Sequence, residues 1–322
     1  MQLPVQYLLD SEPWVAYRTR VDLLGEAEGS EHVINVRESM LAHPLIKNLL
    51  SSLNNLESEI TNSHKSATAF FHRLSFLADV GIQASDAGVG EVLQLILKHQ
   101  SPDGPFQVLM NIPKAFGGTG IDQRAWALCD SPLLVFILAK MGLAKDSRVL
   151  DAMRFLAQLA RENGYPCAVS PKLGKFRGPG RKEDPCPIAN LFMLKAMAEL
   201  PDWRDSTFAH LAAESILNQW HHSQESHPYM FFMGTDFRKL KAPMVWYDVL
   251  HVTDTLSRFA WLRHDPRLMQ MAEVICSKID TQGLVTPESV WMAWKEWDFG
   301  QKKTPSGWLT FLVHRLRLRI YG

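Results

Sequence analysis

The sequence predicts an all-α protein built as an α/α toroid, a double ring of antiparallel helix pairs. Three observations predict this fold class. Aspartates recur at intervals of 60, 59 and 60 residues, at Asp86, Asp146, Asp205 and Asp265. The residue three positions after each aspartate is always apolar, and offsets of three, seven, ten and fourteen share one helix face. The helix expected before each of these aspartates is also more apolar than the helix expected after it. A fixed period of this length is typical of repeats that bury their apolar faces on one another.

The expected elements follow in order along one domain of 322 residues. Residues 1–65 are expected to form an atypical capping repeat, with a first helix that starts at Pro13 and can end at Gly25. Residues 66–322 form the main repeats. Apolar inner helices are expected at 66–80, 130–141, 184–200, 243–256 and 306–320. Outer helices of about 15 residues are expected after the four aspartates.

The long connections all follow an outer helix and precede an inner one. They span residues 101–129, 163–184, 221–243 and 280–305, whereas the links within pairs are short. In a double ring, the loops that lead from an outer helix to the next inner helix all lie at one end, the mouth where the inner helices begin. Long irregular segments in a compact domain are often functional, so we expect chemistry at this mouth.

Composition narrows the classes of partner. Thirty-four basic residues balance thirty-four acidic ones, so no overall field favours nucleic acid. No apolar run reaches the roughly 20 residues that a membrane span needs, and the first residues do not resemble a secretory signal. Four cysteines without paired spacing indicate a reduced, cytoplasmic protein.

One segment carries a family resemblance. The stretch ILKHQSPDGPF, from Ile96 to Phe106, resembles the QW motif of the squalene cyclase and protein prenyltransferase superfamily. The chain is most similar to its uncharacterised bacterial prenyltransferase-like branch. The resemblance implies an α/α toroid with a central cavity for an isoprenoid or other lipid-like molecule. The other three turns are eroded copies, and the acidic DxDD and DDxxD motifs of terpenoid cyclases are absent.

The resemblance also implies a zinc site. Asp184 and Cys186 resemble the Asp-x-Cys ligands of protein prenyltransferases, and His251 follows one turn after a Tyr-Asp pair that replaces the family's Tyr-His. Thiolate, carboxylate and imidazole together can hold zinc. The alternative is that Asp184 caps a helix and Cys186 is a small buried residue. Cys129 and Cys167 are also expected near the mouth, and convergence of the three thiols would favour a metal.

Three aspartates are candidates for a general acid. Asp130, Asp184 and Asp248 fall at or near the starts of inner helices, where burial can keep a carboxyl protonated. Helix capping explains the first two equally well. Asp248 is the best candidate because it is set among apolar and aromatic residues.

Two further groups could bind a ligand. Aromatic rings can line a lipid chain or stabilise a carbocation, although core packing is the alternative; the candidates are Trp246, Tyr247, Phe71 and Trp126. A basic loop before Asp184 could receive a diphosphate or carboxylate, although a solvated loop is the alternative; its candidates are Lys175, Arg177 and Arg181.

Two functions fit these patterns. The first is a terpenoid cyclase or prenyltransferase-like toroid that binds an apolar small molecule in its central cavity, with transferase or cyclase activity. The second is a non-catalytic scaffold that binds a peptide or protein.

Overall fold

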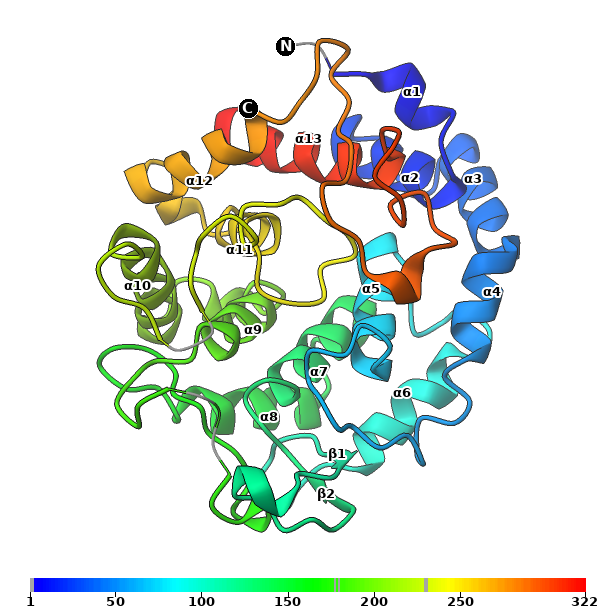
Figure 1. The fold of residues 1–322 in the computed structure, drawn as a ribbon. Coiled ribbons are helices and arrows are strands. Elements are labelled where there is room, and N and C mark those ends of the chain that lie inside the picture. The colour runs from blue at the N-terminus through cyan, green and yellow to red at the C-terminus, as the bar shows by residue number, and fades with distance from the viewer. Residues whose placement is uncertain (1–2, 177, 179, 229–230) are drawn as a thin grey trace. The chain divides into compact units, whose positions relative to one another are not determined.

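The computed structural model describes residues 3–176, 178, 180–228 and 231–322. These residues form thirteen α-helices and one short hairpin, which confirms the all-α class (Figure 1). The helices are α1 (Val5–Leu9), α2 (Pro13–Arg18), α3 (Glu31–Ala42), α4 (Pro44–Ser51), α5 (Phe70–Val80), α6 (Val89–Lys98), α7 (Ser131–Leu138), α8 (Ser147–Ala157), α9 (Pro187–Met197), α10 (Thr207–His221), α11 (Val249–Leu256), α12 (Pro266–Cys276) and α13 (Gly307–Tyr321).

The four helices expected after the recurring aspartates are present as α6, α8, α10 and α12. Two of the aspartates cap them: Asp146 and Asp265 each accept the backbone N–H two residues further on, at 2.9 and 2.8 Å. In α10 the cap is Ser206, which accepts an N–H at 3.2 Å. In α6 it is Gly88, in the left-handed conformation. The helices therefore keep the period, while their caps vary with the local residue.

The helices predicted to be inner are the more deeply buried ones. Every residue of α7, α9 and α11 is buried, whereas α8, α10 and α12 bury one face. A helix that is apolar all round needs neighbours on every side, and a helix with one apolar stripe can lie at a surface. The apolarity of each segment thus predicts its burial.

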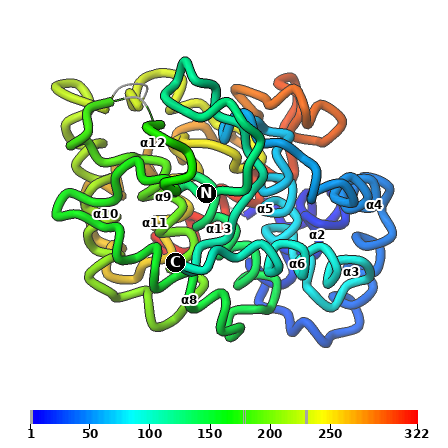
Figure 2. Tube along the Cα trace, turned by 90° about the horizontal axis from the view of Figure 1, so that it is seen from below, coloured from blue at the N-terminus to red at the C-terminus, as the bar shows by residue number. Residues whose placement is uncertain are grey.

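The chain forms two compact units. Unit 1 comprises residues 1–52, 79–81 and 234–322, and unit 2 comprises residues 53–78 and 82–233. In unit 2, α9 lies between α7 and α10, and α8 packs on α7 (Figure 1). In unit 1, α13 packs on α1, α2, α11 and α12, and α3 packs on both α2 and α4. Figure 2 shows α2 and α4 together among the blue N-terminal turns.

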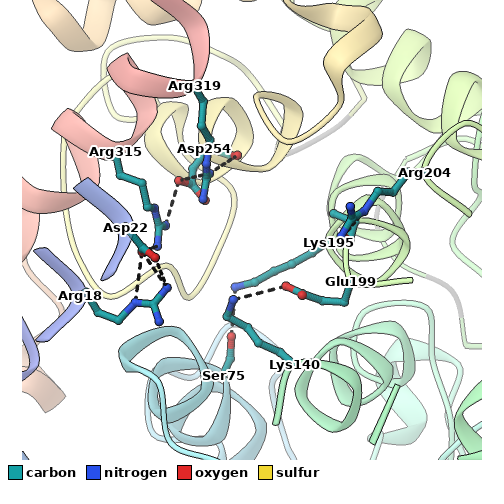
Figure 3. Close-up of polar contacts among 11 residues, drawn as sticks. Arg18, Asp22, Ser75, Lys140, Lys195, Glu199, Arg204, Asp254, Arg315 and Arg319 are labelled. Carbon is teal, nitrogen blue, oxygen red and sulfur yellow. Dashed lines mark hydrogen bonds and ion pairs between the residues drawn. The ribbon is translucent and has the colours of Figure 1, made fainter. Parts of the chain in front are cut away.

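Each unit buries charged side chains between its helices. In unit 1, Arg315 and Arg319 of α13 both reach Asp254 of α11, at 2.9 and 3.0 Å, as Figure 3 shows. In unit 2, the buried Lys195 donates to Ser75 Oγ at 3.1 Å (Figure 3). Such groups join helices through polar contacts inside an otherwise apolar core.

The long loop before α7 contains the hairpin. Strand β1 (Val108–Met110) pairs antiparallel with β2 (Gln123–Ala125). Beyond β2, the chain pairs with the loop that follows α8 through an antiparallel bridge between Ala127 and Val169. That second loop pairs in turn with the segment before α9, at Pro166 and Pro185. Backbone pairing therefore lays three loop segments of unit 2 side by side.

The expectation about membrane spans also has a structural counterpart. Among the described residues, no helix combines the length and the apolar character that crossing a membrane requires.

Candidate functional site

The loops of unit 2 bring together two cysteines that the sequence places near the inner-helix starts. The antiparallel bridge between Ala127 and Val169, with the Leu128 N–H donating to the Ala168 carbonyl at 3.0 Å, holds together the two loops that carry Cys129 and Cys167. All four cysteines of the chain are free thiols, and Cys129 and Cys167 are both partly exposed. The pairing explains how residues from two long loops come to adjoin.

The third cysteine joins them through a second backbone contact. The Cys186 N–H donates to the Tyr165 carbonyl at 2.7 Å, which places Cys186 beside the loop that carries Cys167. The Asn190 side chain holds this junction, because its amide donates to the carbonyls of Tyr165 and Cys186 at 3.0 and 2.8 Å. Burial raises the pKa of the Cys129 thiol, and the charges of Asp130 and of the other two cysteines add to the rise. The three thiols thus lie near enough to influence one another.

An imidazole and a carboxylate complete the cluster. Nε2 of His64 lies 2.7 Å from Oδ2 of Asp130, whose side chain is fully buried. The other carboxylate oxygen accepts the Ala127 N–H at 3.0 Å, so Asp130 does not cap α7 with its side chain. The ligand atoms of His64, Cys129 and Asp130 all lie within 4.8 Å of one another. We call these three residues the thiol–imidazole cluster.

Residues of α5 hold His64 in place. The ring of His72 donates from Nε2 to the His64 carbonyl at 2.8 Å. Burial lowers the pKa of His72 to about 3, so this ring is neutral at physiological pH. Phe71, one of the predicted ligand-lining residues, is fully buried and stacks on the His64 ring with centroids 6.3 Å apart. Sequence reasoning missed His64, since no motif or spacing links it to the cysteines.

In unit 1, Asp248 is a buried carboxyl. Oδ1 accepts the His251 N–H at 3.0 Å and caps α11, while Oδ2 has no hydrogen-bond partner among the described residues. Burial raises the pKa of Asp248 to about 6, against the opposing charge of Lys241. The ring of His251 donates from Nδ1 to the Trp246 carbonyl at 2.8 Å. Asp248 therefore combines a capping role with one oxygen that stays available.

Aromatic rings lie close to this carboxyl in the chain and in space. Tyr247 is almost buried, and its ring packs 4.9 Å from that of Phe237. The ammonium group of Lys241 lies 4.8 Å from the centre of the Trp291 ring. Trp246 is only partly buried. The Trp291 ring therefore already faces one cation, the ammonium group of Lys241.

The remaining predicted residues lie elsewhere in unit 2. Asp184 accepts the Arg181 N–H at 2.9 Å, and Cys186 takes the N-cap position of α9 in its place. Trp126 is buried against Phe155, with ring centroids 5.5 Å apart. Asp184 and Cys186 belong to unit 2 and His251 belongs to unit 1. The zinc site expected from those three residues stays a prediction.

The basic loop carries the other predicted ligand residues. Lys175 is exposed, and its backbone N–H donates to the Gly117 carbonyl at 2.9 Å. Arg177 lies outside the described residues. Lys175 therefore presents its ammonium group to solvent, as the solvated-loop alternative expects.

A cavity of about 920 Å³ in unit 2 lies between α10 and its neighbouring loops, and Arg181 and Asp184 line it. Its wall also carries the carboxylates of Glu162, Glu214 and Glu225. This excess of carboxylates disfavours a phosphate in the cavity.

Comparison of the chain with protein-family models and with curated proteins gives no match.

Proposed function

We propose that the protein is an α/α toroid of the squalene cyclase and prenyltransferase type that binds an apolar, isoprenoid-like molecule and protonates it with Asp248. The observation that carries the proposal is the fully buried Asp248 carboxyl, whose Oδ2 has no hydrogen-bond partner among the described residues. Burying a charged carboxylate with one oxygen unpaired is costly, so the neutral acid is favoured. A neutral acid in an apolar site is a proton donor near neutral pH.

The reaction would begin at a carbon–carbon double bond. The Asp248 O–H bond breaks, and the alkene's π electrons form a new C–H bond with the released proton. The positive charge remains on the more substituted carbon. Loss of a proton from a neighbouring carbon to the Asp248 carboxylate then gives a new alkene and restores the neutral acid, which exchanges its proton with solvent between turnovers. Atoms and charges balance without a further reactant.

The surroundings support both charged species. The positive charge of Lys241 lowers the pKa of Asp248 against the effect of burial, so its ammonium group stabilises the carboxylate left after proton transfer. An aromatic face such as that of Tyr247, the residue before Asp248, stabilises a cation by about 0.5–2 kcal/mol. The aliphatic residues of α11 exclude water, which would otherwise capture the cation.

Other features support the toroid fold and the cellular compartment that we propose. Strongly apolar helices alternate with helices that bury one stripe, as a double ring requires. The four free thiols suit a reducing compartment, and we propose the cytoplasm.

The test is proton transfer to an added alkene. The full chain is incubated in D₂O with squalene or geranylgeraniol, and deuterium in the recovered lipid is measured by mass spectrometry. The Asp248→Asn variant keeps an oxygen that can cap α11 but cannot donate the proton. We expect deuterium incorporation to fall by about 10²–10⁴-fold. Asp205→Asn is the control, because Asp205 is 84% exposed.

The pH profile separates a catalytic role from a structural one. If Asp248 is the acid, the rate falls tenfold per pH unit above about 6, because only the protonated carboxyl donates. A rate that Asp248→Asn leaves unchanged contradicts the proposal. Binding of squalene or geranylgeraniol without deuterium incorporation contradicts the catalytic part and supports a carrier. Binding of neither contradicts it entirely and supports the scaffold function.

A further inference from the structure

The thiol–imidazole cluster has the chemistry of a metal site. It combines the sulfur of Cys129, an imidazole nitrogen of His64 and a carboxylate oxygen of Asp130, which are the three ligand types that zinc prefers. A carboxylate that contacts a histidine ring recurs at zinc sites, either as a ligand or as the group that orients the ring. None of these side chains is needed for the proton transfer proposed for Asp248.

We propose that His64, Cys129 and Asp130 bind one zinc ion in unit 2. The proposal is independent of the function proposed for Asp248, which lies in unit 1. It also differs from the ligand set that the family resemblance implies, since Asp184 and His251 take no part.

The geometry supports a single ion. The three ligand atoms lie within 4.8 Å of one another. Ligands of a tetrahedral zinc ion at about 2.0–2.3 Å from the metal stand roughly 3.3–3.8 Å apart. Binding would therefore open the 2.7 Å hydrogen bond between His64 and Asp130 and shorten the longest separation by about 1 Å. Cys129 retains some exposure, which gives an ion a route to the cluster.

The charge of the cluster also suits a cation. The Cys129 sulfur lies within 4.8 Å of a ligand oxygen of Asp130, whose carboxylate is fully buried. A zinc ion would take the place of the thiol proton and supply a positive charge there.

Neighbouring groups position the ligands. The Ala127 N–H holds one oxygen of Asp130 at 3.0 Å, and His72 holds the His64 backbone at 2.8 Å. Cys167 accepts the Gly178 N–H at its sulfur, at 2.8 Å. With Cys186, it is one of two further thiols whose charge reaches Cys129. Three protein ligands would leave a fourth position for water, a substrate or one of these thiols.

The first test is metal content. The full chain is purified without a metal-affinity step, loaded with zinc, dialysed and analysed for metal. We expect one zinc per chain. Cys129→Ser and His64→Gln should weaken zinc binding at least about 10–100-fold. Cys276→Ser is the matched control, because Cys276 is a partly exposed thiol of α12 in the other unit.

A second test uses only the unaltered chain, so a poorly folded variant cannot obscure the result. Cobalt(II) in place of zinc should give a thiolate-to-cobalt charge-transfer band and the visible spectrum of tetrahedral coordination. Zinc should also protect Cys129 from alkylation by N-ethylmaleimide, as read by peptide mass spectrometry, and leave Cys276 unprotected.

Three results would overturn the proposal. The first is the lack of stoichiometric zinc in the loaded wild-type chain. The second is equal loss of zinc from Cys129→Ser and Cys276→Ser. The third is rapid alkylation of Cys129 at neutral pH regardless of zinc, which would identify a nucleophilic thiol instead.

Discussion

Gly164 lies in the loop that carries Cys167, at a position where the packing leaves no space for a side chain. Its φ is +105°, and an added Cβ would lie 2.6 Å from Ser215 Cβ and 2.7 Å from the Asn190 side-chain oxygen. That same oxygen accepts the Tyr165 N–H at 2.8 Å. Moving the Asn190 side chain away from an added Cβ would therefore break this hydrogen bond. We expect Gly164→Ala to lower the free energy of unfolding by roughly 2–3 kcal/mol.

Urea denaturation measures this loss. The matched control is Gly88→Ala, also in unit 2, where φ is +78° but a Cβ would meet open space. Backbone strain alone should cost about 1 kcal/mol there. Equal losses in the two variants would show that contact with Asn190 contributes nothing.

His72 predicts a pH dependence of stability. Its pKa falls from an ordinary value of 6.5 to about 3 on burial, so the unfolded chain binds a proton between these values and the native chain does not. The contribution of His72 to the free energy of unfolding is therefore complete above pH 6.5. It is lost as the pH falls below that value, by at most about 1.4 kcal/mol per pH unit. We expect His72→Gln, whose amide can still donate to the His64 carbonyl, to remove this part of the slope.

Unfolding free energies between pH 7 and pH 4 check the prediction, because the gap between wild type and variant should change steadily over that range. His210→Gln is the control, since His210 is exposed on α10. A constant gap for His72→Gln would mean that His72 titrates normally in the native state.

Local sequence predicts single residues better than it predicts their partners. The apolar and aromatic neighbours of Asp248 predict its burial, but they place it inside a helix over 243–256, whereas in the structure it is the N-cap of α11. By contrast, the hydrogen bond between His64 and Asp130 joins residues 66 apart. It depends on three loop segments that pair outside any regular sheet, and irregular pairing leaves no periodic pattern in a sequence.

Between elements, the ion network of α11 and α13 makes the clearest prediction. Burial alone would raise the pKa of Asp254, but the charges of Arg315 and Arg319 hold it well below its ordinary value. Asp254→Ala would remove the nearer of the two carboxylates that contact the buried Arg315, at 2.9 Å, and leave only the more distant Asp22 at 3.7 Å. Breaking a buried pair by removing one partner costs about 3–5 kcal/mol. Thermal unfolding should show a loss of that size.

The control is Asp236→Ala, which removes an 80% exposed partner of Lys239 in the same unit. Exposed pairs contribute about 0–1 kcal/mol. If Asp254→Ala costs no more than this control, water or another group must solvate Arg315 in the variant, and the network does not join the two helices.

At the scale of the elements, the helical pattern predicts well where each helix begins and poorly which residues of other helices it contacts. The recurring aspartates predict where α6, α8, α10 and α12 begin to within a few residues. The four-residue spacing of Arg315 and Arg319 in α13 places them on one helix face, and in the structure both reach the same carboxylate, that of Asp254. The sequence could not show this, because Asp254 lies in another helix.

At the scale of the whole molecule, the order in which the chain passes through its two units bears on whether they unfold together. Unit 1 needs both ends of the chain, since α13 packs on α1 and α2, and Arg315 lies 3.7 Å from Asp22. Residues 79–81, which include the last two of α5, also belong to unit 1. Neither unit is a continuous piece of chain, whereas independent domains usually are. We therefore expect a single cooperative domain of 322 residues, as the repeat predicts.

Scanning calorimetry of two variants tests this expectation. Gly164→Ala weakens unit 2 and Asp254→Ala weakens unit 1. If the chain is one cooperative domain, each variant shifts the same single transition and the calorimetric enthalpy equals the van't Hoff enthalpy. In a domain of this size each kcal/mol lowers the Tm by about 2 °C. Two transitions, each shifted by only one of the variants, would show that the units unfold independently, and the prediction of one domain would be wrong.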